Sequence, residues 1–115
     1  MKVYGIKNCD TMKKTFALLE EIGVSYEFFD YKKQTPTVAV LKSFLAKTSL
    51  ETLVNRQGTT YKKLEDAQKE AMQQESTALT ILMAQPSMIK RPLIEYGDGS
   101  VTLGFVPDQI VAKLR

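Results

Sequence analysis

The residue most able to carry out chemistry in this sequence is its only cysteine, Cys9. The chain has no histidine, which excludes a Ser-His-Asp triad, a Cys-His pair and a histidine-ligated zinc site. A single cysteine also excludes a Cys-x-x-Cys dithiol, an all-cysteine zinc site and an iron–sulfur cluster held by this chain alone. A thiolate or a carboxylate must therefore carry out any reaction that this protein catalyses.

Cys9 lies in a short polar loop, between Asn8 and Asp10, at the predicted start of a helix. A helix N-terminus directs backbone N–H groups and the positive end of the helix dipole at such a side chain. Both favour the thiolate, and reactive cysteines are typically partly exposed in electropositive surroundings. The alternative is a small buried apolar cysteine, which is the more frequent state of cysteines in general. The polar neighbours favour the exposed, activated thiol.

Two arginines, Arg56 and Arg91, are candidates to assist this thiol. Arg91 precedes Pro92, and the residue before a proline is held in an extended conformation. Guanidinium groups bind oxyanions through paired hydrogen bonds and stabilise a neighbouring thiolate. From spacing alone, an ordinary surface arginine is an equally good interpretation of either residue.

The composition is that of one globular domain, with 115 residues of which 43% are apolar and 25% charged. The net charge of +3 is dispersed along the chain, which suits a small anionic ligand and disfavours direct binding of nucleic acid. No segment reaches the roughly 20 apolar residues that span a bilayer, and no signal-peptide core is present, so we expect no membrane association. Because one cysteine cannot form an internal disulfide, we expect a soluble protein of the reducing cytoplasm.

The first thirty residues have a β-α-β pattern. Residues 2–6 favour a strand, and the apolar spacing from residue 12 onward predicts a helix that ends at Gly23 in a left-handed conformation. Residues 24–31, rich in aromatic side chains, predict a second strand. Two strands joined by a helix are normally parallel, with a right-handed crossover.

Residues 35–84 carry no strand signal and predict a series of short helices, with Thr35, Thr60 and Ser76 among the predicted N-caps. Strand signals return over residues 92–103, which predict a β-hairpin around a glycine-rich turn, followed by a closing helix.

This order of elements predicts a thioredoxin-like α/β fold. We expect a four-stranded mixed sheet with flanking helices and a helical insertion, residues 35–84, between strands two and three, all within one domain of residues 1–115. Cys9 then lies where the first strand meets the first helix, the redox position of that fold. Pro92 opens the third strand, where thioredoxin-like proteins carry a cis-proline that faces the active site.

Three segments occur in a characteristic order: residues 4–11 (YGIKNCDT), 55–61 (NRQGTTY) and 89–93 (IKRPL). They resemble the three signature segments of the arsenate reductase ArsC/Spx family. The similarity extends over nearly the whole chain and is closest to the small YffB-like thiol reductases of that family.

The resemblance implies roles for particular residues. Cys9 corresponds to the nucleophilic cysteine, and Arg56 and Arg91 match two oxyanion-binding arginines. The motifs also imply substrate-binding residues before the nucleophile and on both sides of Arg91. These are Lys7, Asn8, Lys90 and Pro92.

The resemblance also implies a glutathione-dependent thiol oxidoreductase with no bound cofactor, which acts on a small anionic or disulfide substrate. Glutathione or another external thiol, such as glutaredoxin, would resolve the covalent intermediate on the cysteine. Residues 100–106 lack the third arginine of arsenate reductases, which weighs against arsenate. The alternative is an Spx-like regulator that binds RNA polymerase. Those regulators usually have Cys-x-x-Cys, whereas this chain has Met12 at the position of the second cysteine. A third interpretation is a thioredoxin-fold domain with neither activity.

Overall fold

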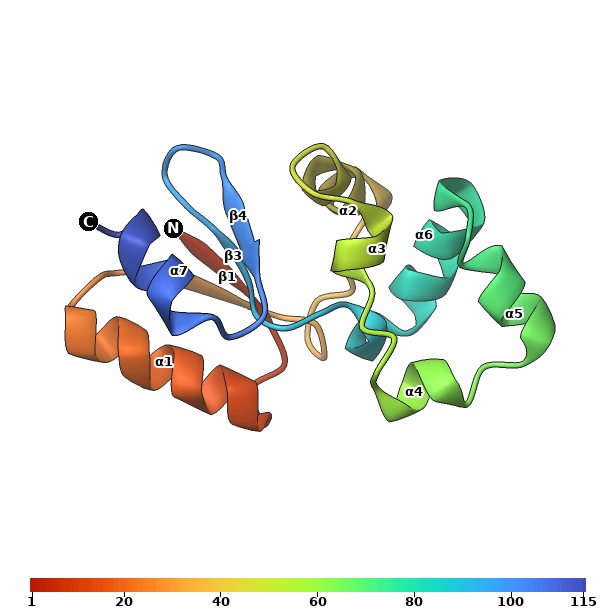
Figure 1. The fold of residues 1–115 in the computed structure, drawn as a ribbon, viewed down its shortest axis with the longest axis horizontal. Coiled ribbons are helices and arrows are strands. Elements are labelled where there is room, and N and C mark those ends of the chain that lie inside the picture. Colours follow the sequence, from red (N-terminus) through yellow and green to blue (C-terminus); the bar gives the residue numbers. More distant parts are fainter. The chain divides into compact units, whose positions relative to one another are not determined.

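The structure, a computed structural model, describes residues 1–115 and divides into two compact units. The first unit comprises residues 1–34 and 91–115, and the second comprises residues 35–90 (Figure 1). The interpretation of the whole chain as one domain with an inserted helical segment stays a prediction from the sequence.

The first unit begins with the predicted β-α-β segment: strand β1 (Lys2–Gly5), helix α1 (Asp10–Ile22) and strand β2 (Glu27–Asp30). The helix ends as the sequence predicts, because Gly23 takes a left-handed conformation (φ 84°) and its N–H donates to carbonyls of the last turn. Strand β2 is shorter than predicted. It pairs in parallel with β1, which is only four residues long, so the residues before β2 have no partner strand.

The chain returns to the same sheet through β3 (Leu93–Glu95) and β4 (Val101–Leu103) and closes with helix α7 (Pro107–Lys113). The strand order is β2-β1-β3-β4, with β1 parallel to β2 and antiparallel to β3, and β3 antiparallel to β4. The predicted fold class is therefore confirmed: the unit is a four-stranded mixed sheet of thioredoxin-like topology.

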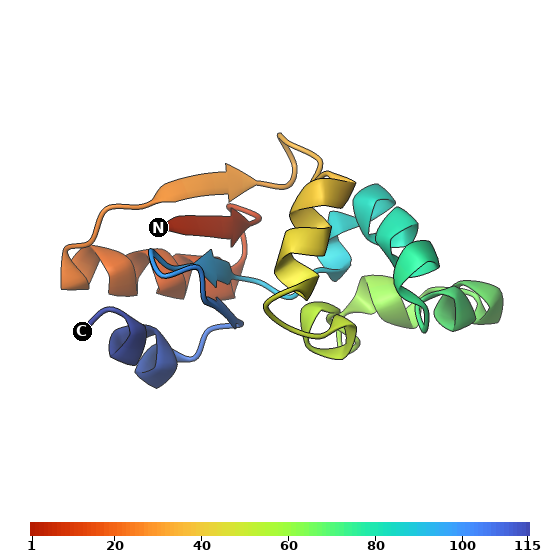
Figure 2. The ribbon, with the colours of Figure 1, turned by 90° about the horizontal axis from the view of Figure 1, so that it is seen from above.

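Helices α1 and α7 cover the same face of this sheet (Figure 2). They bury side chains from the neighbouring strands β1 and β3 beneath them, which is the main source of stabilisation for this unit. The fully or almost fully buried residues of this core are Val3, Met12, Leu19, Ile94, Tyr96 and Ile110.

The second unit is helical and contains no strand, in agreement with the sequence (Figure 1). An isolated antiparallel bridge joins Val54, which follows the third helix of the chain, to Ile89 near the end of the unit. Its helices are α2 (Val38–Leu45), α3 (Leu50–Leu53), α4 (Thr59–Lys62), α5 (Asp66–Ala71), α6 (Glu75–Ala84) and the short 3-10 helix η1 (Pro86–Met88).

Three predicted helix caps in this unit are wrong. Thr37, not Thr35, caps α2, because its hydroxyl accepts a hydrogen bond from the N–H of Val40 at 3.2 Å. Helices α4 and α6 begin before Thr60 and Ser76, so both residues lie inside the helices that they were predicted to cap. No helix of either unit is both long and apolar enough to cross a membrane.

Candidate functional site

Cys9 is the N-cap residue of α1. Its backbone is extended (φ −131°, ψ 140°), and its carbonyl accepts the first helical hydrogen bond from the N–H of Lys13 at 2.9 Å. The side chain is partly buried and packs against the edge of the core beneath the sheet. The thiol is therefore held in one place while part of it stays accessible, which combines the two alternatives that the sequence left open.

Gly5, the last residue of β1, allows the first turn of α1 to lie close to the strand. A Cβ atom at this position would lie 2.6 Å from Sδ and 2.7 Å from Cε of Met12, far inside van der Waals contact. Met12 is fully buried in the core. The absence of a side chain at Gly5 thus fixes how closely the helix that carries Cys9 approaches the sheet.

The hydroxyl of Thr11 is a partner of the thiol that the sequence did not identify. Thr11 Oγ1 lies 3.1 Å from Cys9 Sγ, within hydrogen-bond distance for sulfur. When Cys9 is ionised the hydroxyl must be the donor, because a thiolate has no proton to give. The signal in the sequence was a hydroxyl residue two positions after the cysteine at the start of the helix.

The surroundings of Cys9 lower its pKa below the ordinary value. Burial is the largest single influence and raises the pKa, but it is outweighed by the hydrogen bond from the Thr11 hydroxyl, the backbone N–H groups of Thr11 and Met12, and the positive charge of Arg91. Both N–H groups belong to the first turn of α1 and favour the thiolate over the thiol. The direction agrees with the sequence prediction of an activated thiol.

Three strand ends and the start of α1 meet at one edge of the sheet. Gly5 at the end of β1 pairs with Asp30 at the end of β2, and Tyr4 pairs with Leu93 at the start of β3. Since β3 runs antiparallel to β1, the residues before Leu93 also lie at this edge. This topology explains how Arg91, far from the cysteine in sequence, comes near enough for its charge to act on the thiol.

Arg91 and Pro92 are joined by a cis peptide bond, as thioredoxin-like proteins led us to expect. The carbonyl of Pro92 accepts a hydrogen bond from the N–H of Gly104 at 2.9 Å, which ties this turn to the end of β4. Arg91 also lowers the pKa of Tyr31, although burial dominates and holds the pKa of that phenol well above its usual range. The Tyr31 hydroxyl is buried without a hydrogen-bond partner.

The other predicted site residues fall in both units. Lys7 and Asn8 are exposed in the loop before Cys9, in the first unit. Lys90 and Arg56 belong to the second unit. Lys90 is exposed and its N–H donates to the Leu53 carbonyl at 2.8 Å, whereas Arg56 Nε is buried and has no hydrogen-bond partner. The assignment of Arg56 and Lys90 to the same site as Cys9 stays a prediction from the motifs.

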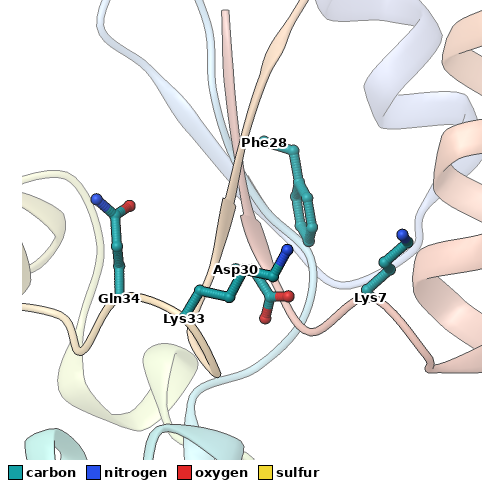
Figure 3. Close-up of a pocket in the computed structure, with 5 residues that line it drawn as sticks. All are labelled: Lys7, Phe28, Asp30, Lys33 and Gln34. Carbon is teal, nitrogen blue, oxygen red and sulfur yellow. The ribbon is translucent and has the colours of Figure 1, made fainter.

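A pocket of about 280 Å³ lies in the first unit at the ends of β1 and β2, and most of its lining was not predicted from the sequence. Lys7 contributes from the loop before Cys9, and the others come from β2 and the turn after it (Figure 3). The lining residues are Lys7, Phe28, Asp30, Lys33 and Gln34. Neither unit contains a group of three or more cysteine or acidic side chains that could hold a metal ion.

Comparison with known proteins identifies relatives over almost the full length. Residues 4–112 match the ArsC family. The solved structure of a YffB protein is 45% identical, covers 99% of this chain and 98% of its own, and superposes with a TM-score of 0.92. An arsenate reductase (ArsC) related protein from Brucella melitensis is 42% identical, with coverage of 99% and 93% and a TM-score of 0.75. An uncharacterised protein of Haemophilus influenzae is 35% identical over 103 residues, which are 90% of this chain and 89% of that one.

Proposed function

The chain belongs to the ArsC family, and we propose that it is a thiol oxidoreductase in which Cys9 is the nucleophile and glutathione the external reductant. The observation that carries this proposal is the state of the thiol. Cys9 is held at the N-terminus of α1 with a lowered pKa and a hydroxyl donor 3.1 Å from its sulfur. A structural cysteine needs none of these features, whereas a nucleophile needs the thiolate.

The reaction that we propose reduces a mixed disulfide between a substrate thiol and glutathione. The Cys9 thiolate attacks the glutathione sulfur, the original S–S bond breaks, and the substrate leaves as a thiolate that takes a proton from water. Cys9 is now bonded to glutathione. A second glutathione thiolate attacks the glutathione sulfur of this intermediate and releases the Cys9 thiolate with oxidised glutathione. One free glutathione is thus consumed in each cycle: its sulfur is oxidised as the substrate sulfur is reduced, and the glutathione of the mixed disulfide leaves as the other half of oxidised glutathione.

An external thiol is needed because Cys9 is the only cysteine of the chain. The positive charge of Arg91 favours the thiolate and would also favour an anionic substrate group beside it. Arg56 supports anion binding in the second unit, since a buried guanidinium N–H without an acceptor is unfavourable unless an anion satisfies it. Arsenate is the less favoured substrate, because residues 100–106 supply no third cation.

The test is to incubate the protein with oxidised glutathione and measure its intact mass, with Cys9→Ser as the control. We expect one glutathione on the wild type, none on Cys9→Ser, and complete removal of the adduct by reduced glutathione with release of oxidised glutathione. A wild type that takes up no glutathione at neutral pH, or an adduct that reduced glutathione does not remove, would contradict the proposal. The remaining interpretations would then be a binding protein, such as the RNA-polymerase regulator, and a thioredoxin-fold domain with neither activity, and neither of these needs an acidic thiol.

A further inference from the structure

The pocket beside the Cys9 loop combines charges of both signs with an aromatic wall. Lys7 and Lys33 bring two ammonium groups and Asp30 brings one carboxylate, and Gln34 lines the pocket with its side chain directed away from these groups (Figure 3). The ring of Phe28 forms the apolar side and is fixed from behind by an edge-to-face contact with Phe16, with ring centroids 5.0 Å apart. Such a lining is not that of a simple anion site, since Asp30 would repel the anion.

We propose that this pocket binds the α-amino-acid group of the thiol co-substrate, which in glutathione is the γ-glutamyl end. The ammonium of that group pairs with Asp30, its carboxylate pairs with the lysines, and its methylenes lie along the Phe28 ring. The proposal rests on the proposed function, because it concerns the thiol that attacks or leaves Cys9. It assigns to this chain a specificity site separate from the arginines.

The pocket is within reach of the thiol. Lys7 is two residues from Cys9, so their Cα atoms are at most about 7 Å apart. The opposite wall is joined to the end of β1, since Asp30 pairs with Gly5 and the N–H of Tyr31 donates to the Gly5 carbonyl at 2.8 Å. Three extended residues span about 10 Å, so each end lies about 5 Å from the central residue, and the side chains of the two bonded cysteines add to this reach. A tripeptide bonded through its central sulfur to Cys9 can therefore place one end in the pocket.

Asp30 retains the capacity to accept the ligand ammonium. Its Oδ1 accepts a hydrogen bond from the N–H of Lys32 at 2.9 Å, which orients the carboxylate at the start of the turn. A carboxylate has about four acceptor positions on two oxygens, so this bond leaves others open to the pocket. Asp30→Asn keeps the Oδ1 acceptor and the shape but removes the charge, and is therefore the appropriate variant.

The experiment measures binding of S-methylglutathione to the full-length Cys9→Ser protein by amide chemical shifts, without any reaction. We expect shifts at Lys7 and Gln34. The dipeptide γ-glutamyl-S-methylcysteine should bind nearly as well, and S-methylcysteinylglycine, which lacks the γ-glutamyl group, should bind about fivefold more weakly. Asp30→Asn and Lys33→Gln should each lower the affinity for the two γ-glutamyl ligands about fivefold and leave the affinity for S-methylcysteinylglycine unchanged. Lys32→Gln is the matched control, since it removes the same charge from a neighbour outside the pocket, and should change binding less than twofold.

The outcomes separate this proposal from the proposed function. If Cys9 accepts and releases glutathione but the two dipeptides bind equally well, and Lys33→Gln behaves like Lys32→Gln, the pocket assignment is wrong and the reductase proposal stands. If Cys9→Ser binds the γ-glutamyl ligands selectively while the wild type forms no mixed disulfide, the pocket assignment stands as an amino-acid site and the reductase proposal fails. Shifts confined to residues outside the pocket would also overturn the assignment.

Discussion

Replacement of Thr11 by valine tests how the thiol of Cys9 is activated. Valine has nearly the shape of threonine, so the substitution removes the hydroxyl that lies 3.1 Å from Cys9 Sγ and leaves the helix backbone in place. A hydrogen bond to a charged group contributes about 1.5–3 kcal/mol. Because Cys9 is only partly buried, water replaces some of this, and we take a value just below this range, about 1.4 kcal/mol, which corresponds to one pKa unit. The ratio of thiolate to thiol at a fixed pH should then fall about tenfold.

The effect on reaction rate should change sign with pH. A thiol of higher pKa forms a more nucleophilic thiolate, by about threefold for a tenfold change in acidity, given a Brønsted coefficient of about 0.4–0.5. Below both pKa values the variant should therefore react with a disulfide about threefold more slowly than the wild type, since the loss of thiolate outweighs the gain in nucleophilicity. Above both pKa values each thiol is fully ionised, and the variant should react about threefold faster.

The assay is the pH–rate profile of reaction with 4,4′-dithiodipyridine, a small disulfide followed by release of a coloured thione. Thr11→Ser keeps the hydroxyl, and its profile should follow that of the wild type. A Thr11→Val profile that coincides with the wild type at every pH would refute the role of the hydroxyl. A uniform slowing without a crossing point would show that the substitution hinders access to the sulfur and does not change its ionisation.

Three further predictions concern other parts of the first unit. Arg91→Ala should raise the pKa of the cysteine less than loss of the neighbouring hydroxyl does, and Arg91→Lys should restore most of the difference, as alkylation against pH will show. Tyr31→Phe removes a buried hydroxyl without a partner and should leave stability unchanged or raise it by about 1 kcal/mol, whereas Tyr96→Phe breaks a 2.7 Å bond to a threonine and should cost about 1 kcal/mol in urea unfolding. Gly5→Ala should cost about 1–3 kcal/mol because its Cβ overlaps a buried methionine, whereas Gly97→Ala, which meets no atom within 4 Å, should stay within about 0.5 kcal/mol.

The fold could be predicted where the signal is local. The apolar spacing of α1 and the left-handed Gly23 after it are both readable within one segment, and both are as predicted. Boundaries that depend on a partner were less accurate. Strand β2 begins at Glu27 because β1 offers pairing only from Lys2, and no local feature of residues 24–26 shows this. Threonines stand on both sides of Pro36, and the sequence does not show which of the two hydroxyls reaches a helical N–H. In the structure it is the hydroxyl of Thr37, so helix α2 begins after that residue.

The candidate site also combines groups that the local sequence indicates with groups that only strand pairing brings to the thiol. The thiol and its position at the start of a helix follow from a short polar loop, and the N–H groups of Thr11 and Met12 that lower its pKa are backbone groups. No side-chain substitution in α1 removes them. The groups that would recognise a substrate, Asp30 and Arg91 among them, reach the thiol only through the register of β1 with β2 and β3. A change at Asp30 should therefore alter the choice of thiol partner and leave the acidity of the thiol unchanged, whereas loss of Arg91 should weaken both.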